Sequence, residues 1–472
     1  FEPLETPAVE NIETLTGKYG EEGNQLIFKI LKRGEKLDVN ADEKDLADLA
    51  LRYDLTVPLA RVVANHKNEL PKFFKRYQIQ PVWRADRPAR GRYREFYQCD
   101  VDAIGSSSML VEAELISAVC EILKRLNFKN FTIRINHREI LTAILEVSGI
   151  SKDQQTEALV ALDKIDKIGR EGVEKEFKER GISDEAGIKL LTAFEFFLRE
   201  KAKENLSEKQ KMLLLKFLNT QKNLSDEFVK EIRTLERMIQ NTETSSQVLE
   251  ILQRHKNAME SLNIMDDIEE FLGNHEAGNS ALNNLKEIWT FGNEEFDTLK
   301  IDPSLARGLS YYTGAIFEIN VPDLVGSLGG GGRYDGLIGM FGKEQIPACG
   351  FSLGLERILV VMEERGMFPK ELSDSSADVL VTVWNEDSIG ESLKLAGELR
   401  KQGLRVLVYP EADKLGKQFK YADSIKVPFI CVLGETELAE NKVTLKNLRT
   451  GEQEIVSRED IAGKSRSETL GD

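Results

Sequence analysis

The sequence is poor in the residues that usually bind metals or form disulfides. Its 472 residues include four cysteines and four histidines, and the cysteines lie far apart in apolar runs. Isolated apolar cysteines are typical of reduced core side chains, which favours a cytoplasmic location. The cysteines and histidines show no zinc-binding spacing, so we expect no structural metal site.

Long apolar segments and several nucleotide-binding motifs are also missing. No window approaches the roughly 18 uncharged apolar residues that a membrane span needs, so we expect no membrane partner. The sequence contains no dinucleotide fingerprint, no Walker A loop and no HExxH zinc motif. If the protein uses ATP, we therefore expect it to bind ATP without a P-loop.

Positive charge is in deficit as well, since the formal net charge is −16. A local basic patch can still bind a polyanion on an acidic protein, so the charge neither supports nor excludes an RNA partner. Hydrophobic residues make up 41% of the chain and charged residues 31%, as in ordinary globular proteins. The chain is longer than one core usually organises, and we expect two or three domains.

Residues 74–102 form the most informative stretch. Two strand-like runs, 76–83 and 95–101, flank a basic loop that contains proline and glycine, which predicts a hairpin. Strand alternation places four residues on one face of the second strand: Phe96, Gln98, Asp100 and Asp102. Such a face beside arginines suits a ligand with a flat base, a polyphosphate and an ammonium or imidazole group. The alternative is a solvated hairpin whose arginines only pair with nearby acids, and this stretch alone does not decide between the two.

Residues 51–65 combine polar side chains with the start of a helix. Asp54 and Thr56 come just before a helix-like run, and Pro58 is acceptable in the first turn. Taken alone, capping is the favoured role of the two polar residues, because their oxygens can satisfy free backbone N–H groups.

Two further stretches combine arginine, tyrosine and glycine. In residues 305–319, Arg307 and Gly308 precede two tyrosines and a strand that begins near Thr313. Residues 327–339 contain four consecutive glycines, which permit either close backbone approach to a ligand or a flexible loop.

Residues 346–362 contain a formal G-x-S-x-G match from Gly350 to Gly354, the pattern of the nucleophile elbow in α/β-hydrolases. That fold needs a histidine after the serine, and none follows His275, so we reject a hydrolase. Two interpretations remain: a plain strand and helix with Arg357 on the surface, or a helix whose Arg357 binds phosphate.

The rest of the chain predicts helices and a second α/β unit. Apolar residues at helical spacing in 109–126 predict an amphipathic helix, and charged, leucine-rich runs from 149 to 293 predict a mostly helical module. After a linker-like segment at 367–378, strand-like and helical runs alternate, which is typical of a small α/β domain with a mixed sheet. Lysines along the second helix of this domain would meet either a phosphate backbone or only solvent.

Several of these stretches resemble the signature motifs of class II aminoacyl-tRNA synthetases, in the form found in the histidyl-tRNA synthetase family. The loop RPARGRYR with the strand EFYQCDVD resembles the second motif, and residues 347–357 resemble the third. FEPLETPAVENIETL resembles the end of the first motif, and we expect the rest of that motif to precede Phe1. Residues 305–319 and 327–339 resemble two histidine-specific signatures, except that Ser310 stands where the family usually has aspartate.

The resemblance implies an α/β fold with an α+β catalytic domain, in which helices flank the antiparallel class II sheet. It assigns residues 1–148 and 297–370 to the catalytic domain and 149–296 to a helical insertion. Residues 375–472 would form the C-terminal α/β anticodon-binding domain. The first motif contributes to a dimer interface in class II enzymes, so the resemblance also implies a homodimer.

The activity implied by the resemblance is the ATP-dependent attachment of L-histidine to tRNA(His) through histidyl-adenylate. Mg²⁺ would bridge the outer phosphates of ATP. The catalytic residues would be Arg84, Arg307 and Gln98. ATP would contact Arg84, Phe96 and Arg357, with Phe96 stacked on adenine and Arg357 at the γ-phosphate. Nine residues would contact histidine: Asp54, Thr56, Arg84, Gln98, Asp102, Arg307, Tyr311, Tyr312 and Tyr334.

Within this set, Asp102 and Tyr312 would address the two imidazole nitrogens, because neutral imidazole offers one donor and one acceptor. Two other classes of protein remain open. A catalytically silent relative that senses histidine or uncharged tRNA would share the fold, but the intact arginine and glutamine candidates and the C-terminal domain argue against it. A class II synthetase for another amino acid would lack the histidine-specific signatures.

Overall fold

The computed structural model divides into two compact units, Phe1–Met367 and Phe368–Asp472. The residues that it describes are 1–18, 20–38, 40, 42, 45–162, 165–198, 256–291, 298–308, 311–369 and 375–469. Ser310, where the sequence departs from the family pattern, and residues 199–255 of the predicted helical module lie outside the described residues. Among these residues, no helix has the length and apolar character needed to cross a membrane.

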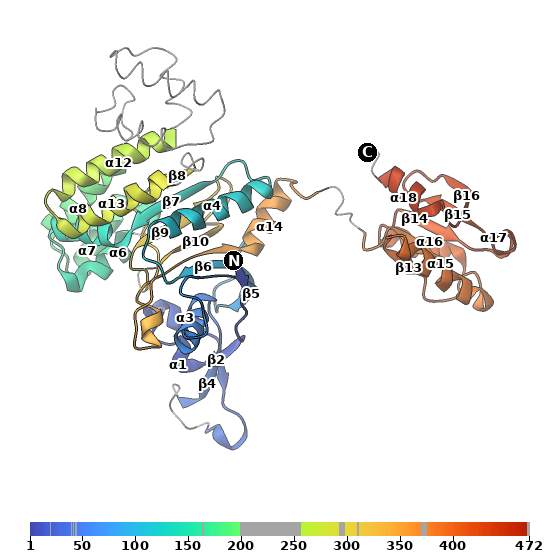
Figure 1. Ribbon diagram of the computed structural model, residues 1–472, viewed down its shortest axis with the longest axis horizontal. Coiled ribbons are helices and arrows are strands. Elements are labelled where there is room, and N and C mark those ends of the chain that lie inside the picture. The colour runs from blue at the N-terminus through green and yellow to red at the C-terminus, as the bar shows by residue number, and fades with distance from the viewer. Residues whose placement is uncertain are drawn as a thin grey trace, which may run out of the picture. The chain divides into compact units, whose positions relative to one another are not determined.

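The first unit is built on an eight-stranded sheet (Figure 1). Its strands, in spatial order, are β1 (Glu2–Pro3), β5 (Phe74–Trp83), β6 (Glu95–Ile104), β11 (Ala348–Gly354), β10 (Gly329–Arg333), β9 (Ala315–Asn320), β7 (Thr132–His137) and β8 (Leu299–Ile301). The two outermost pairs are parallel and all pairs between them are antiparallel. The predicted antiparallel sheet is therefore confirmed, with parallel strands added at its edges.

The predicted hairpin is confirmed as β5 and β6, which extend beyond the expected ends to Phe74 and Ile104. Its register pairs Arg76 with Asp102 and Gln78 with Asp100. The predicted polar face is the buried one: Gln98, Asp100 and Asp102 are buried, while Tyr97 is exposed. Buried polar groups need partners, so this face must satisfy its own hydrogen bonds or those of a ligand.

The four glycines form β10 in the middle of the sheet, so the flexible-loop interpretation is wrong. Close approach by neighbouring strands explains the glycines. A Cβ atom on Gly331 would lie 2.1 Å from the carbonyl oxygen of Gly350, and one on Gly350 would lie 1.9 Å from Oδ1 of Asp102. Both distances are far below van der Waals contact, so any side chain here would displace a strand or the carboxylate.

The opposite face of the sheet is apolar, and helices cover it except at the hairpin, where Tyr77, Ile79 and Tyr97 are exposed. Ala103, Cys349 and Phe351 alternate with the polar residues and share a core with α4 (Leu110–Arg125), which confirms the predicted amphipathic helix. The helix α14 (Leu355–Glu364) follows β11 directly and packs against β6 and β11. The two helices thus cover the apolar face of the sheet and lie away from its polar face.

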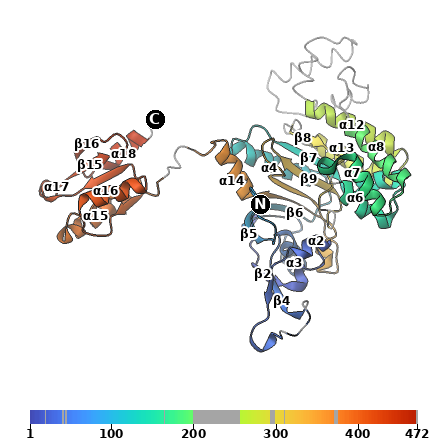
Figure 2. The same ribbon diagram turned by 180° about the vertical axis from the view of Figure 1, so that it is seen from behind.

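The predicted helical module is confirmed where the structure describes it. It contains α6 (Gln155–Leu162), α7 (Ile165–Glu179), α8 (Asp184–Leu198), α12 (Lys256–Leu272) and α13 (Glu276–Phe291). These helices gather at the β7–β8 end of the sheet, as the opposed views in Figures 1 and 2 show, and pack with α5 (Arg138–Ser148). Their buried side chains belong to the same apolar core as those of the sheet. The predicted boundaries at 148 and 297 stay predictions.

A smaller part of the first unit holds the start of α3 (Thr56–His66). It contains a three-stranded sheet of β2 (Val9–Asn11), β4 (Ala47–Leu51) and β3 (Lys29–Leu31), in that order. The short helices α1 (Ile12–Leu15) and α2 (Gly20–Gln25) accompany it. The sequence did not predict this sheet, because its strands are too short to show a clear alternation.

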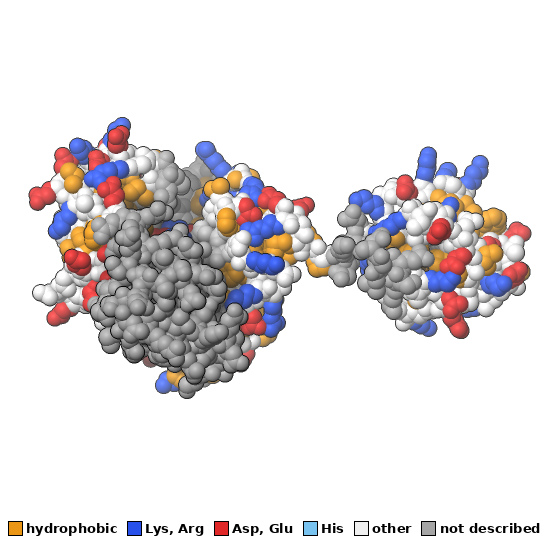
Figure 3. Space-filling view, turned by 90° about the horizontal axis from the view of Figure 1, so that it is seen from above, with side chains coloured by type: hydrophobic (Ala, Val, Ile, Leu, Met, Phe, Trp, Pro, Cys, Tyr) orange, Lys and Arg blue, Asp and Glu red, His pale blue; other side chains and the backbone are white. Residues whose placement is uncertain are grey.

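The second unit has the predicted mixed sheet, in the order β13 (Val406–Val408), β12 (Val379–Val381), β14 (Phe429–Val432), β15 (Lys442–Asn447) and β16 (Gln453–Ser457). The first three strands are parallel, and the last two add an antiparallel hairpin that the sequence did not predict. The helices are α15 (Ile389–Lys401), α16 (Leu415–Ser424), α17 (Glu435–Glu440) and α18 (Ile461–Thr469). Basic and acidic side chains both lie on the face of this unit shown in Figure 3.

A buried ion pair ties the sheet to α4. Nε of Arg333, at the end of β10, lies 2.5 Å from Oε1 of Glu112, and both side chains are almost fully buried. We expect Glu112→Ala to destabilise the protein by about 3 kcal/mol, because removing one partner leaves an uncompensated buried charge. Urea unfolding of the full chain measures this. The control is Glu121→Ala, which breaks the exposed pair with Arg125 on the same helix and should cost under about 1 kcal/mol. Equal losses in the two variants would contradict the assignment.

Candidate active site

The polar face of the sheet carries a hydrogen-bonded row of buried side chains. Nη1 of Arg76 donates to Oε1 of Gln78 at 2.8 Å, and Nε2 of Gln78 donates to Oε1 of Gln80 at 2.6 Å. Arg52 donates to the same Gln80 oxygen from the other side, at 2.7 Å. This row fixes the β5 side of the site before any ligand is present.

Asp102, the expected imidazole-binding carboxylate, is held by two side chains. Nη2 of Arg76 lies 2.8 Å from its Oδ2, and the hydroxyl of Tyr334 donates to its Oδ1 at 2.5 Å. Burial raises the pKa of the Asp102 carboxyl, and Arg76 and the Tyr334 hydrogen bond oppose that rise. The protein therefore orients both oxygens of this carboxylate.

A small cavity joins several of the predicted residues. It has a volume of about 20 Å³ and is lined by Thr56, Tyr312, Tyr334, Asp100 and Asp102, together with glycines of β10 and β11. This volume holds about one water molecule. An amino acid therefore enters only when side chains that line the cavity move.

Arg84, Phe96 and Gln98 are brought together beside this cavity. The guanidinium of Arg84 lies over the rings of Tyr53 and Phe96, with centroid distances of 4.2 and 5.1 Å. Its Nη2 donates to Oε1 of Gln98 at 3.3 Å, and Nε2 of Gln98 donates to the hydroxyl of Ser352 at 2.7 Å. The amide of Gln98 thus links the arginine to the carboxylate end of the site.

Arg307 and Arg357 meet at Ser327. Nη1 of Arg307 donates to the Ser327 hydroxyl at 2.8 Å and lies 2.8 Å from Oε2 of Glu318. Nη1 of Arg357 donates to the Ser327 carbonyl oxygen at 2.5 Å. Burial lowers the pKa of Arg357, and the charges of neighbouring arginines, including Arg307 and Arg84, lower it further. A cluster of cations that repel one another is a site for a polyanion such as a polyphosphate.

Asp54 does cap α3, as the favoured interpretation predicted. Its Oδ1 accepts a hydrogen bond from the backbone N–H of Val57 at 3.0 Å. The same residue is buried and lies close enough to Tyr311 to raise the pKa of that hydroxyl, after the larger effect of burial. The rings of Tyr311 and Tyr312 pack together with a centroid distance of 4.6 Å. Capping and ligand contact are therefore compatible roles for Asp54.

The arginines in and beside the hairpin loop have two kinds of partner, which are acidic side chains and the residues of the site. Arg92 pairs with Asp86 at 2.7 Å, as the solvated alternative anticipated, and Arg90 pairs with the distant Glu364 of α14. Arg84 is different, because it lies over aromatic rings and contacts Gln98.

Several polar residues at the site were missed as site residues, among them Arg76, Asp100, Glu318 and Ser352. Asp100 had a signal, because it shares the polar face of β6 with Gln98 and Asp102. The sequence also contained a signal for Glu318, which is the one acidic residue in the apolar run of β9. The role of Arg76 depends on its cross-strand pairing with Asp102, which the sequence pattern does not specify.

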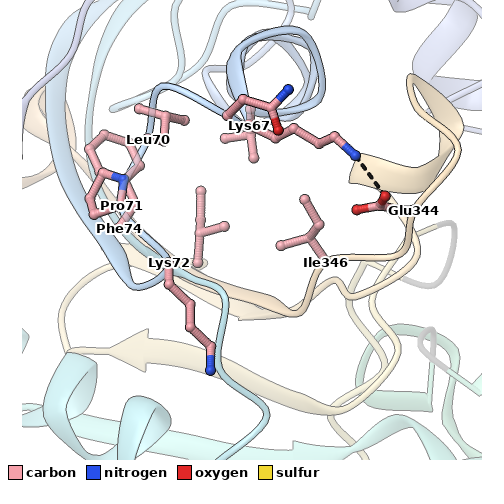
Figure 4. A pocket seen from close by; sticks show the side chains of 10 residues that line it. Lys67, Leu70, Pro71, Lys72, Phe74, Glu344 and Ile346 are labelled. Carbon is pink, nitrogen blue, oxygen red and sulfur yellow. Dashed lines mark ion pairs between the residues drawn. The ribbon is translucent and has the colours of Figure 1, made fainter.

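A larger cavity of about 330 Å³ lies elsewhere in the first unit (Figure 4). Its walls include apolar side chains such as Leu70, Phe74 and Ile346, and an ion pair of 2.7 Å joins Lys67 to Glu344 at its rim. None of the predicted site residues lines it. Volume alone therefore does not identify the active site, and the convergence of polar groups on the sheet does.

Comparison with known proteins places this geometry in context. A family model described as histidyl-tRNA synthetase matches residues 1–228 and 219–358, and a model described as anticodon binding domain matches residues 378–468. The histidine–tRNA ligases of Christiangramia forsetii and Flavobacterium johnsoniae are 38% and 39% identical to the chain; each comparison covers 98% of this chain and 91% of the relative.

Solved structures of histidyl-tRNA synthetases also resemble this chain. The crystal structure of histidyl-tRNA synthetase from Nostoc sp. PCC 7120 matches with a TM-score of 0.68 and 29% identity, covering 99% of this chain and 91% of that one. The apo histidyl-tRNA synthetase of S. aureus, at 20% identity and a TM-score of 0.52, shares the fold over 98% of this chain and 90% of that one.

Proposed function

This chain belongs to the histidyl-tRNA synthetase family, and from this premise we propose that it attaches L-histidine to tRNA(His) with ATP. The resemblance predicted from the motifs is thereby confirmed. In the first proposed step, the histidine carboxylate attacks the α-phosphate of ATP to give histidyl-adenylate and pyrophosphate. In the second, the terminal ribose hydroxyl of the tRNA displaces AMP.

The observation that carries the proposal is the meeting of an arginine cluster and a carboxylate pocket on one sheet face. Phosphoryl-group chemistry depends mainly on positioning and charge neutralisation, which arginine provides. We assign Arg84 and Arg307 to the α-phosphate and the substrate carboxylate, with Gln98 beside them as the third catalytic residue. Arg357 would hold the γ-phosphate, and Phe96, which lies beside Arg84, would stack on adenine.

The amino-acid pocket divides into a backbone end and a ring end. Asp54, Thr56 and Gln98 would hold the α-amino and carboxylate end. Asp102 and Tyr312 would address the imidazole, with Tyr311 and Tyr334 as walls. Support comes from the shared cavity of Thr56, Asp102, Tyr312 and Tyr334. Further support comes from the hydrogen bond and the ion pair that orient Asp102.

Mg²⁺ would enter with ATP and neutralise charge on the outer phosphates. In the described part of the chain, no group of three or more His, Cys, Asp or Glu side chains could hold a metal. That fits a cation held chiefly by substrate phosphates and water, which is the usual state of Mg²⁺ at nucleotide sites.

The second unit would bind the anticodon part of the tRNA, and the protein would act in the cytoplasm as a homodimer. The lysines of α16 are candidate phosphate contacts, although Lys417 pairs with Asp413 at 2.6 Å. We propose the hairpin face opposite the site as the surface for a second copy, because Tyr77, Ile79 and Tyr97 are exposed there. Sedimentation of the full chain would report a monomer if this part of the proposal is wrong.

Pyrophosphate exchange with each standard amino acid tests the function. We expect exchange with histidine and none with the other amino acids above background, because buried polar partners reject side chains that cannot pair with them by roughly 10⁴-fold or more. Exchange with a different amino acid would refute the specificity. A folded protein that binds histidine but exchanges nothing would instead be a histidine sensor.

A further inference from the structure

Asp100 is a buried carboxylate inside the pocket to which the family motifs give no role. It lies between Gln98 and Asp102 on the same face of β6, is 2% exposed and lines the small cavity with Tyr312 and Tyr334. Its cross-strand neighbours are Gln78 on β5 and Ser352 on β11. A carboxylate at this depth is costly unless a cation or several donors compensate for it.

The protein compensates Asp100 only in part. The Ser352 hydroxyl hydrogen-bonds to it, but Nη2 of Arg76 lies 3.9 Å from its Oδ2, compared with 2.8 Å from Oδ2 of Asp102. Among the described residues, Oδ1 of Asp100 has no hydrogen-bond partner, and neither has Oδ2 of Asp102, although Oδ2 forms an ion pair with Arg76. Two buried carboxylate oxygens of the pocket are therefore without a hydrogen-bond donor.

The charges around Asp100 do not balance. The groups that face it are Arg76 from β5, Asp102 from β6, Ser352 from β11 and Asp54 from the segment before α3. The charge of Arg52, which follows β4, also acts on Asp100 but is shared with Glu10 and Glu5. Two cations, one of them shared, thus stand against three carboxylates. Burial is the main reason that the pKa of Asp100 rises to about 7; Arg76 and Ser352 oppose the rise, and Asp102 and Asp54 add to it. A cationic ligand group would offset the excess negative charge, and one with two N–H donors would also satisfy the two unpartnered oxygens, Oδ1 of Asp100 and Oδ2 of Asp102.

We propose that Asp100 contacts the substrate side chain and that the pocket holds the imidazole ring of histidine as the imidazolium cation. This inference rests on the proposed function. Asp102 then accepts a hydrogen bond from one ring nitrogen and Asp100 balances the charge of the ring. The unperturbed histidine side chain has a pKa of about 6.5, close to neutrality. Burial disfavours the charged ring, and the two neighbouring carboxylates favour it, so the proposed imidazolium requires the carboxylates to outweigh the burial.

The source of the proton that the ring gains can be named both below and above pH 7. Below about pH 7 the empty site carries a proton on Asp100. When a neutral ring binds, that O–H bond breaks and an N–H bond forms on the ring. Above this pH, Asp100 is already ionised and the ring takes its proton from water. The bound state is the same in both cases: an imidazolium ring beside a carboxylate.

The test is the protonation state of bound, isotope-labelled histidine, measured by nitrogen NMR at about pH 8, where the free ring is neutral. In the full-length wild-type protein, both ring nitrogens should show the shifts of a protonated ring. Calorimetry in buffers of different ionisation enthalpy should show uptake of about one proton for each histidine bound. In Asp100→Asn, the bound ring should be neutral and the uptake near zero. Glu121→Gln, which removes an exposed carboxylate from α4, should behave as the wild type.

Two results would overturn the inference: a neutral ring bound to the wild type, or a protonated ring bound to Asp100→Asn. The wild-type measurement decides even if the variant does not fold. If Asp100 had a purely structural role, Asp100→Asn would lower histidine affinity but would not change the protonation state of the bound ring. If histidine is activated but bound neutral, the inference fails and the proposed function stands. If another amino acid is activated in its place, the proposed function fails.

Discussion

Replacing Arg307 by alanine is expected to slow histidyl-adenylate formation by roughly 10³-fold or more in a single turnover, because a positioned cation on a developing phosphoryl charge is worth that much. Binding of histidine should change far less. Arg307 is half-exposed, and its partner Glu318 keeps a second contact, 3.2 Å from Nη1 of Arg134, so the fold should survive the change. The loss should therefore appear in the rate and not in the stability.

Rapid-quench measurement of adenylate formation at saturating histidine and ATP tests this role. Arg307→Lys should recover part of the rate, because it restores charge without the planar fork of donors. Arg125→Ala is the matched control, since it removes an exposed, paired arginine from α4. If the Arg307→Ala variant formed histidyl-adenylate at the wild-type rate, Arg307 would have no role in that step.

Asp102→Ala should weaken histidine binding by roughly 10³-fold, because it deletes the ring's acceptor and leaves Arg76 buried without its closest carboxylate. ATP binding should change by less than about threefold, because its expected contacts, Arg84, Phe96 and Arg357, do not touch Asp102. Calorimetric titration of each ligand against the same protein sample measures both constants.

Asp102→Asn separates recognition from folding in this experiment. Asparagine keeps the shape and can still accept the hydrogen bond from Tyr334, so the pocket should stay formed while the charge is lost. We expect the Asn variant to bind histidine more weakly than the wild type and to melt at a higher temperature than Asp102→Ala. Comparable losses of histidine and ATP binding in both variants would show a general defect and refute the assignment.

The sequence predicted the parts of the site that follow from local periodicity. Gln98, Asp100 and Asp102 were placed on one face because alternation along a strand does not depend on its neighbours. The start of α3 followed in the same way, because Asp54 and Thr56 precede a helical run. The family resemblance then supplied the roles, which strand alternation could not.

What the sequence could not predict depends on contacts between strands. Arg76 lies opposite Asp102 only because of the β5–β6 register, and nothing in the local pattern of β5 specifies that register. Glycine usually weakens strands, so residues 329–332 gave no strand signal. They form β10 because neighbouring strands and the Asp102 carboxylate occupy the space that side chains would need. The β15–β16 hairpin was missed because its strands are mostly polar and half-exposed.

The apolar core shared by the sheet and the helices of residues 155–291 limits how this enzyme could be shortened. Leu285 and Ile288 of α13 and Ile268 of α12 are fully buried in the core that also contains Ile133 of β7 and Ile301 of β8. Cutting out these helices would expose one wall of that core to water, at about 25 cal/mol for each Å² of apolar surface. A shortened version of the enzyme would therefore need a replacement surface there, because these helices support the sheet as part of its core.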